Sequence, residues 1–417
     1  MRVAVIGAGI VGMSAASYLQ RDGHEVFVVD PNEPGEGTSF GNAGCINPSS
    51  VVPMSMPGTL KNVPKYLTDP LGPLSIRWSY LPFITPWLIR FIRAGRRDRV
   101  EAQARGLKAL LGPALTNLGA LAKGAGAENL LHQVGHLVAY KGPESRAKDN
   151  ATWDLRRDNG IKFDELNTDE LRQLEPELSR DYTQGVLIGG NGHLSNPGGF
   201  VKKLAEAFVR NGGHMVREKT TGFEFIDGQL ASVRTDHGTH QADRAVVAAG
   251  IWSKPLAAGL GDRLPLETER GYHIVIQDPE ARPRTPTMSG DGKFVATPMD
   301  MGLRVAGTVE LAGLNAQPNW ARADKLLRQV QEMYPKLARS IPEARLTRWM
   351  GHRPSFPDSL PVIDRSGRSP DVFYAFGHGH TGMTGGSTTG KIVADLIAGR
   401  ASGIDLAPFS RSRFDQF

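Results

Sequence analysis

The chain has 417 residues, of which 40% are hydrophobic and 22% are charged, proportions typical of a globular enzyme with room for more than one core. The formal net charge of +6 is a mild basic excess, which a solvated basic surface explains; an anionic membrane as partner is the alternative. Binding of nucleic acid is not expected, because the sequence has no basic motif with interleaved aromatic residues. The single cysteine, Cys45, rules out an internal disulfide and suits a reducing compartment, and no apolar run is long enough to span a bilayer.

The chain opens on a dinucleotide-binding pattern. Residues 3–7, VAVIG, form a short β-branched run typical of a buried strand, and Gly7, Gly9 and Gly12 follow it as G-x-G-x-x-G. These glycines permit a tight turn, close approach of the backbone to a pyrophosphate, and close packing of a helix on the strand. A helix over about 10–21 would direct its first N–H groups, at Ile10 and Val11, toward the phosphates. Because the strand begins at once, we expect no signal peptide and a cytoplasmic protein, either free or associated with the inner face of the cell membrane.

The second strand and the loop after it indicate FAD. Residues 24–30, HEVFVVD, end in Asp30, whose carboxylate can accept a hydrogen bond from the adenosine ribose and disfavours the 2′-phosphate of NADP. A typical NAD domain would continue with another strand–helix unit, but residues 37–44, GTSFGNAG, form a polar, glycine-rich loop without a helix pattern. Such a loop lets the backbone approach a second bulky part of the ligand closely.

Residues 78–100, WSYLPFITPWLIRFIRAGRRDRV, combine aromatic and aliphatic residues with a following cluster of arginines. The segment is too short, and too often interrupted by proline, to span a bilayer. Apolar side chains beside a basic cluster fit a helix that lies on an anionic lipid surface. The alternative is an ordinary helix that packs on its own protein and keeps its arginines in water.

The rest of the chain predicts a mixture of helices and strands. Helices are predicted within about 102–131, at about 199–210, at about 319–334, and from the glycine-rich turn after residue 377 to about 399. Buried strands are predicted at 244–250 and 372–377, and alternating runs between about 264 and 311 predict antiparallel strands.

Several segments together resemble one flavoprotein family. They are the N-terminal motif, GTSFGNAG, VVAAGIWS at 246–253, GHRPSFPDSLPVID at 351–364, and FGHGHTGMTGGSTTGKIVADLIAG at 376–399. The chain resembles the D-amino acid oxidase-type FAD-dependent oxidoreductases, and among them the D-amino acid dehydrogenases, including those acting on D-proline and hydroxy-D-proline. The resemblance implies an α/β fold in which a Rossmann-like FAD-binding domain is interleaved with an antiparallel-sheet α+β substrate domain. The implied FAD-binding domain spans 1–50, 190–262 and 350–417, and the substrate domain spans 51–189 and 263–349.

The resemblance also implies how FAD is held. Backbone near Thr220 would lie beside the adenine, and the first N–H groups of the last helix would stabilise negative charge on the reduced flavin ring. His378 and His380 lack a third ligand at metal-binding spacing, so no metal is expected, and Cys45 is expected to be a small buried filler rather than a flavin attachment point. The implied cofactor-binding residues are Gly7, Gly9, Ile10, Val11, Gly12, Asp30, Thr38, Ser39, Asn42, Gly44, Thr220, Ala249, Gly250, Trp252, Gly379, His380, Thr381, Gly382 and Met383.

Oxidation of an amino acid by a flavin requires a fixed substrate carboxylate more than a strong protein base. Arginine suits this role because its planar guanidinium binds a carboxylate through two hydrogen bonds. Arg353, in GHRPSFPD, falls on the carboxylate-binding arginine of the family; an ion pair with Asp358 or Asp364 is the alternative. Asp364 stands where a glycine is common in the family.

Arg270 and Tyr272, in ERGYH, are the other candidate catalytic residues. Arg270 is a second candidate for the substrate carboxylate, or else a partner of Glu267 or Glu269. The Tyr272 hydroxyl would contact the carboxylate or close the pocket, unless it is a core tyrosine. Their neighbours His273 and His352 are weaker candidates.

These features predict an FAD-dependent D-amino acid dehydrogenase that transfers hydride from the substrate to flavin. D-Proline, hydroxy-D-proline and small neutral D-amino acids are the candidate substrates, and a quinone or another electron carrier would accept the electrons. Phe294 and Val295 stand near a position where several oxidases of the family carry tyrosine, which argues against glycine-like substrates. The alternatives are an oxidase of the same fold that makes hydrogen peroxide, and a flavin-binding subunit of a larger electron-transfer complex.

Overall fold

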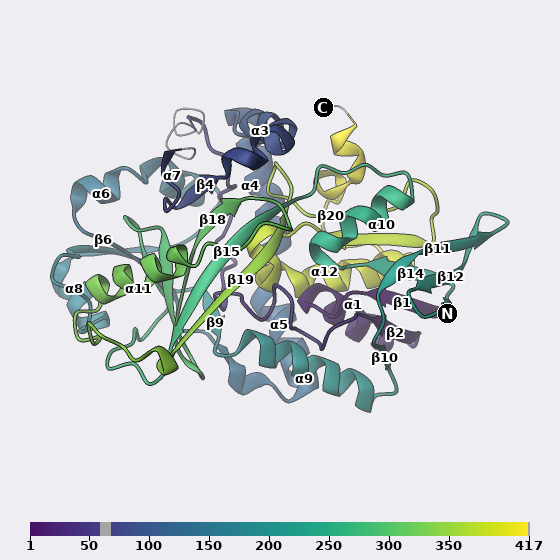
Figure 1. Cartoon of the computed structure of the whole chain (residues 1–417), viewed down its shortest axis with the longest axis horizontal. Helices are drawn as coiled ribbons and strands as arrows, with labels where there is room; N and C mark the ends of the chain where they lie inside the picture. The colour runs from purple at the N-terminus through teal and green to yellow at the C-terminus, as the bar shows by residue number, and fades with distance from the viewer. Residues whose placement is uncertain (59–67, 416–417) are drawn as a thin grey trace.

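The computed structural model describes residues 1–58 and 68–415 and contains two large sheets that lie side by side. In Figure 1 a mostly parallel sheet lies on the right, and a larger, mostly antiparallel sheet lies on the left. Both sheets draw strands from distant parts of the chain; purple and yellow strands, for example, meet in the right-hand sheet. The expected α/β fold with a second, antiparallel sheet is confirmed.

The parallel sheet forms from short runs rich in valine and other apolar residues, and its central strands are buried along nearly their whole length. Its order is β10–β2–β1–β14–β21–β20, and only β20 runs antiparallel to its neighbour. The strands are β1 (Arg2–Ile6), β2 (Glu25–Val29), β10 (His214–Val216), β14 (Arg244–Val247), β20 (Val362–Arg365) and β21 (Val372–Phe376). Three helices pack beneath it: α1 (Ile10–Arg21), α9 (Pro197–Arg210) and α12 (Gly382–Ile397).

The larger sheet has the order β19–β15–β18–β17–β16–β6–β8–β7, and β4 pairs with β18 at its side. Its long strands are β15 (Glu267–Ile276), β18 (Gly302–Leu311) and β19 (Leu346–Ser355). Its shorter strands are β4 (Leu74–Ile76), β6 (His136–Tyr140), β7 (Asp164–Leu166), β8 (Gln184–Ile188), β16 (Thr287–Ser289) and β17 (Phe294–Met299). α11 (Ala321–Met333) packs on β15 and β18 around a core that includes Ile274, Val305 and Leu326.

Smaller elements complete the fold. Two small sheets contain β11 (Thr220–Ile226), β12 (Gln229–Thr235) and β13 (Thr239–Gln241), and β3 (Cys45–Ile46), β5 (Leu131–His132) and β9 (Gly192–Leu194). The other helices are α3 (Leu81–Ala94), α4 (Arg97–Leu111), α5 (Ala114–Ala125), α6 (Pro143–Ala147), α7 (Asn150–Asp158), α8 (Thr168–Leu174) and α10 (Ser253–Gly259). Short 3₁₀ helices include η2 (Trp78–Tyr80), η4 (Gly250–Trp252) and η6 (Gly379–Thr381).

The α4–α5 hairpin packs on the parallel-sheet side rather than on the larger sheet. Leu107, Leu110, Leu118 and Leu121 belong to the same buried cluster as Met13 of α1. The division of the chain at residues 51–189 was expected to place this hairpin in the substrate domain. Its packing instead groups it with the helices under the dinucleotide sheet, because its leucines complete the apolar layer around α12.

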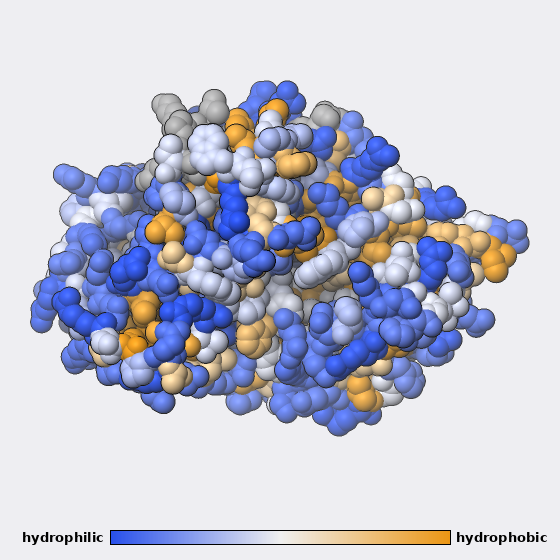
Figure 2. All heavy atoms as spheres, viewed as in Figure 1, coloured by the Kyte–Doolittle hydropathy of each residue, from blue (hydrophilic) through white to orange (hydrophobic). Residues whose placement is uncertain are grey.

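The aromatic segment 78–100 folds into η2, α3 and the start of α4. One face of α3 is buried through Ile84, Trp87 and Phe91, whereas Trp78 and Phe83 are 65% and 74% exposed. In Figure 2 apolar side chains are visible over α3 at the top of the molecule. Within the described residues, no helix combines the length and the hydropathy needed to cross a membrane.

Candidate active site

The order of the parallel sheet brings four sequence motifs to one edge. β2, β1, β14 and β21 are consecutive and parallel, so their carboxyl ends lie at the same edge. Asp30, Gly7, Ala248 and Gly377 are the residues at or just beyond these four ends. The edge therefore gathers the first glycine motif, the acidic residue, AAGIWS and the second glycine-rich turn, which are far apart in the chain.

The first glycine motif forms a close-packed cradle at the start of α1. Gly7 has a φ of +110°, and a Cβ atom there would lie 2.5 Å from the carbonyl oxygen of Ala248. A Cβ at Gly12 would lie 1.8 Å from the Gly7 oxygen, so only glycine fits. The N-cap Gly9 offers no side chain to the first N–H groups of the helix. Ser39 accepts the Ile10 N–H at 3.0 Å, and its hydroxyl proton remains available for a phosphate oxygen.

The other N-terminal candidates surround this cradle. Asp30 accepts the Ala8 N–H through Oδ2 at 2.8 Å, which holds its carboxylate at the end of β2. Thr38 donates to the carbonyl of His352 at 2.9 Å and so joins the loop to β19. Asn42 accepts the Gly44 N–H through Oδ1 at 2.8 Å, and its amide N–H₂ group is not used in that turn.

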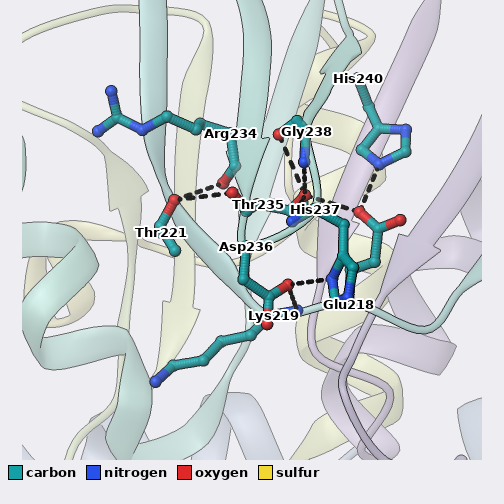
Figure 3. A network of polar contacts seen from close by, with 9 residues as sticks. All are labelled: Glu218, Lys219, Thr221, Arg234, Thr235, Asp236, His237, Gly238 and His240. Carbon is teal, nitrogen blue, oxygen red and sulfur yellow. Dashed lines mark hydrogen bonds and ion pairs between the residues drawn. The ribbon is translucent and has the colours of Figure 1, made fainter.

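Thr220 begins β11, and its side-chain oxygen is buried without a hydrogen-bond partner among the described residues. A network of polar contacts fixes the segment around it, as Figure 3 shows. Glu218 accepts from the Thr235 hydroxyl at 2.6 Å and pairs with His240 Nε2 at 2.8 Å. The Lys219 N–H donates to Asp236 at 2.9 Å. An orphan hydroxyl beside a fixed backbone is what a bound adenine or ribose would use.

The second glycine-rich turn leads into α12 through two left-handed glycines, Gly377 and Gly379, with φ of +91° and +54°. Thr381, the N-cap of α12, donates its hydroxyl to the His378 carbonyl and makes no side-chain cap. The first N–H groups of α12, at Gly382 and Met383, therefore lack a side-chain acceptor. Ala249 precedes η4, which contains Gly250 and the half-exposed Trp252.

Arg353 lies on the face of β15 and β19 that is turned toward these turns. Its guanidinium rests over Gly271, where a Cβ would lie 2.3 Å from Cζ, and Nη1 donates to the Thr308 carbonyl at 3.0 Å. Arg353 also helps to lower the pKa of His380 to about 4, after the larger effect of burial. His380 itself is exposed to water and lines a cavity beside this turn.

The ion-pair alternative for Arg353 is not seen. Asp358 pairs with Arg413 at 2.7 Å instead. Asp364 accepts from the Ser410 hydroxyl at 2.7 Å and the Arg411 N–H at 2.9 Å, and so anchors the C-terminal segment to β20. That contact gives a reason for an aspartate at this position.

Arg270 and Tyr272 lie on the opposite face of β15 from Arg353, since side chains alternate along a strand and Arg353 pairs across from Glu269. Arg270 is fully buried, and its nearest charge is Glu310 at 3.4 Å rather than Glu267 or Glu269. The Tyr272 hydroxyl donates to Glu310 at 2.5 Å and accepts the Asn319 N–H at 3.0 Å. The structure therefore does not bring these two residues together with Arg353.

Comparisons with known proteins agree with this geometry. Residues 2–396 match the family described as FAD dependent oxidoreductase, DAO. The chain belongs to this family. A D-amino-acid oxidase of Bradyrhizobium diazoefficiens is 47% identical over 416 residues, which cover 99% of this chain and 98% of that protein. A D-amino acid dehydrogenase of Paramagnetospirillum magneticum is 32% identical over 432 residues and is aligned along 100% of both chains.

Two solved structures share the fold. Glycine oxidase from Geobacillus kaustophilus superposes with a TM-score of 0.73 at 21% identity, covering 99% of each chain. L-Proline dehydrogenase from P. horikoshii gives a TM-score of 0.74 at 17% identity, covering 100% of this chain and 98% of that chain. At these identities the likeness concerns the fold alone.

The oxidoreductase is FAD-dependent, and its residues fit that cofactor. The glycine cradle at the start of α1, the Thr220 hydroxyl without a described partner and the start of α12 without a side-chain cap lie where a pyrophosphate, an adenosine and a flavin ring need donors. Burial raises the pKa of the Cys45 thiol to about 12, which disfavours the thiolate that covalent attachment requires. No cluster of potential metal ligands occurs in the described part of the chain.

Three side chains on the same face of the larger sheet, Trp349, His273 and Arg304, hold the 37–44 loop in place. The sequence did not point to Trp349 or Arg304, and it marked His273 only as a weaker candidate. Trp349 stacks on His273 with ring centroids 5.1 Å apart, and the His273 ring contacts the Gly41 carbonyl at 3.0 Å. Arg304 donates to the carbonyls of Phe40 and Asn42 at 2.9 and 2.7 Å. Together they fix the 37–44 loop against the sheet. Only the strand register reveals them, because nothing local in the sequence marks these residues.

Proposed function

We propose that this FAD-dependent oxidoreductase oxidises D-amino acids. The observation that carries the proposal is the placement of Arg353 across from the uncapped start of α12, with no acidic partner bonded to its guanidinium. A guanidinium in this position can hold the substrate carboxylate through two hydrogen bonds, which fixes Cα for hydride transfer. The bound FAD supplies the electron-accepting chemistry. The names of the relatives, D-amino-acid oxidase and D-amino acid dehydrogenase, support the choice of substrate.

Small neutral D-amino acids, including D-proline and hydroxy-D-proline, are the substrates that we favour. A cavity next to the site is lined almost entirely by apolar side chains, among them Ile76, Trp87, Phe91 and Leu311. Such a lining suits an aliphatic side chain or ring better than a charged one. The half-buried Val295, on the same face as His273, adds no polar group to this surface.

For the electron acceptor we propose a quinone or another carrier, reached by docking of the exposed α3 surface on the membrane. The exposed Trp78 and Phe83 support this proposal. A second candidate is an oxidase that uses oxygen, and the name of the relative at 47% identity favours it. We keep the domain division as part of the proposal, with the α4–α5 hairpin assigned to the FAD-binding domain.

The test is an anaerobic absorbance titration of the purified holoenzyme with D-proline, hydroxy-D-proline and a panel of D- and L-amino acids. We expect a D-amino acid to bleach the flavin band, and slow recovery in air would indicate a dehydrogenase. Rapid recovery of the flavin band in air, with formation of hydrogen peroxide, would show that the enzyme is an oxidase rather than a dehydrogenase. A flavin band that no amino acid bleaches would overturn the proposed substrate class.

A further inference from the structure

Glu269 is a buried carboxylate to which the proposed reaction assigns no role. It is the third residue of β15, with 4% of its surface exposed. Its Oε2 atom is buried and has no hydrogen-bond partner among the described residues. Ser355 lies close enough to the carboxylate to lower its pKa, against the larger effect of burial. An acceptor left open in this way is costly unless a ligand with a donor completes it.

Two cavities meet at Glu269. The first is bordered by the glycine-rich turn, including Gly379, His380 and Thr381, and by Ser355. The second lies under α3 and is lined by Leu74, Trp87 and Val309, and Glu269 is the one charged side chain among the described residues of its lining. Glu269 therefore stands at the junction between the glycine-rich turn that would face the flavin and the small apolar cavity under α3.

The register of the sheet places Glu269 directly across from Arg353. The two residues are antiparallel partners on β15 and β19, and such pairs have Cβ atoms about 5 Å apart on one face. Their charges do not close into an ion pair, because the Arg353 guanidinium turns over Gly271 and toward the Thr308 carbonyl. A positive and a negative group thus lie on neighbouring strands, on one face, without bonding to each other. An amino acid zwitterion carries the two opposite charges that would complement them.

We propose that Glu269 binds the α-amino group of the substrate and accepts its proton, while Arg353 binds the carboxylate. This inference rests on the proposed function and assigns a substrate-recognition role to a residue that neither the sequence motifs nor the relatives' names identify. It makes the site selective for α-amino acids over 2-hydroxy acids and simple carboxylates. The amine would be a primary ammonium or the ring nitrogen of a proline-type substrate.

The proton step balances without any other reactant. One N–H bond of the ammonium breaks, its electron pair stays on nitrogen, and an O–H bond forms on Oε2 of Glu269. The products are a neutral amine and a carboxylic acid. A neutral amine is the form from which hydride can leave Cα, because its lone pair forms the C=N bond. Burial raises the pKa of Glu269, with Arg353 opposing the effect, and this favours the protonated product.

The groups around Glu269 are compatible with this role. Arg353 on β19 is the charged neighbour that affects it, and His378 and His380 are the titratable groups that line the first cavity with it. Burial lowers the pKa of His378 to about 3 and that of His380 to about 4, so both rings are neutral near pH 7. The loop residues Ser50, Val52 and Met54 add no charge. Among the described residues that line the two cavities there is no lysine or arginine to compete with a substrate ammonium.

The test compares ligands with and without nitrogen on the dithionite-reduced holoenzyme, where the amino acid can bind but cannot be oxidised. Calorimetry would measure the affinity for D-proline and for cyclopentanecarboxylate, and for D-alanine and propionate as a second pair. Glu269→Gln keeps the size of the side chain and removes the charge. Glu267→Gln is the matched control, because Glu267 lies on the same face but already accepts from the Tyr80 hydroxyl.

We expect Glu269→Gln to lower the affinity for the amino acids by about 30-fold or more and to change the affinity for the nitrogen-free acids by no more than about twofold. Glu267→Gln should leave both affinities unchanged. Glu269→Asp, which keeps the charge, should recover part of the binding, and circular dichroism and the flavin spectrum would verify folding. If Glu269→Gln binds the amino acid as tightly as the wild type, the inference is wrong. If the wild type binds none of the amino acids, the proposed function itself fails.

Discussion

The Arg353 guanidinium packs against backbone on two sides, at Gly271 and at Thr308. These contacts fix its position and leave its other N–H groups available to a ligand. Its guanidinium rests on Gly271 and bonds to the Thr308 carbonyl, a residue with a φ of +63° in an irregular part of β18. Burial lowers the pKa of Arg353, but the group remains charged at any ordinary pH. A buried cation with free donors is best completed by a carboxylate.

We expect Arg353→Lys to lower kcat/KM for the best D-amino acid by about 100-fold, since lysine cannot form the paired hydrogen bonds of a guanidinium. The measurement is steady-state kinetics with an artificial electron acceptor, with flavin content as a check on folding. If this variant has the same kcat/KM as the wild type, Arg353 does not bind the substrate carboxylate.

Gly271 offers a second test of the same arrangement that leaves every charge in place. A methyl group there would meet the Arg353 guanidinium at 2.3 Å and would push it away from the sheet. We expect Gly271→Ala to raise KM by at least about tenfold with only a small change in melting temperature. Gly119→Ala is the control, since a Cβ at Gly119 meets nothing within 4 Å. Equal KM values in the two variants would contradict the proposed contact.

At the residue scale, the sequence predicted Arg353 as the carboxylate-binding residue but did not predict which residues contact it. The GHRPSFPD segment marked the arginine, whereas the partner of each charged residue depends on strand register. A shift of one residue exchanges the two faces, so Arg270 and Glu269 could not be distinguished before the β15–β19 pairing was known. The same limitation hid Trp349 and Arg304, whose partners lie in a loop far away in the chain.

The helices α1 and α12 pack closely because α12 carries glycines where it crosses α1. A Cβ at Gly390 would lie 2.6 Å from the Ala15 nitrogen, and one at Gly386 would lie 3.1 Å from the Ile10 side chain. Both helices start at the cofactor edge, so their spacing sets the distance between the donors at the two helix N-termini. The sequence predicted both helices but not this contact, because GMTGGSTTG was read only as a turn and a helix start.

We expect Gly390→Ala to separate α1 from α12, to lower the melting temperature by about 5 °C and to weaken FAD binding. Differential scanning calorimetry and the FAD dissociation constant would measure these effects. Gly119→Ala, in α5, should be neutral or slightly stabilising, because alanine favours the helix. If Gly390→Ala retains FAD like the wild type, the helix contact does not position the cofactor.

Glu175, at the end of α8, should make stability depend on pH. Its Oε1 accepts the N–H groups of Arg284 and Thr285 at 2.8 and 2.9 Å, and burial raises its pKa to about 7 from 4.5. The folded state therefore holds this proton between pH 4.5 and about 7 while the unfolded state releases it. Stability falls as pH rises through that window, by about 3 kcal/mol at most, because one pKa unit corresponds to about 1.4 kcal/mol.

We expect Glu175→Gln to keep its melting temperature more nearly constant than the wild type between about pH 5 and about pH 8. The amide oxygen can still accept both N–H groups, and it has no proton to lose in this range. Thermal unfolding monitored by circular dichroism at several pH values would measure the difference. Parallel curves for the two proteins would show that Glu175 ionises normally in the fold.

For the whole molecule, the sequence predicted two sheet systems, since buried β-branched runs and alternating runs are distinguishable by pattern. It assigned residues 51–189, and with them the α4–α5 hairpin, to the substrate domain, whereas the hairpin packs with the helices under the parallel sheet. Leucine-rich helices fit against any apolar layer, and their position depends on contacts with α1, α9 and α12 that no local pattern encodes. The segment 78–100 gave a similar ambiguity, and α3 in fact has both a buried face and an exposed apolar face.

That exposed face is where the molecule would meet a membrane. Trp78, Phe83 and Ile89 are 65%, 74% and 46% exposed, and burial of each side chain in lipid would contribute about 1.5–3 kcal/mol. The nearby arginines contribute less, because Arg96 and Arg97 lie in ion pairs with Asp98 and Glu101 at 3.4 and 3.6 Å. We therefore expect the apolar side chains to dominate binding and added salt to weaken it only modestly.

The measurement is flotation of the holoenzyme with vesicles of phosphatidylcholine containing phosphatidylglycerol. The double variant Trp78→Ser and Phe83→Ser should lose most of the bound fraction. Ile226→Ser is the control, because Ile226 is 67% exposed on β11, outside the α3 surface. Both proteins should retain wild-type activity with a water-soluble acceptor, since neither change reaches the cavities. If wild-type protein stays in solution at every vesicle composition, the electrons must leave through a carrier or oxygen that reaches the flavin from water, and the oxidase becomes the better description.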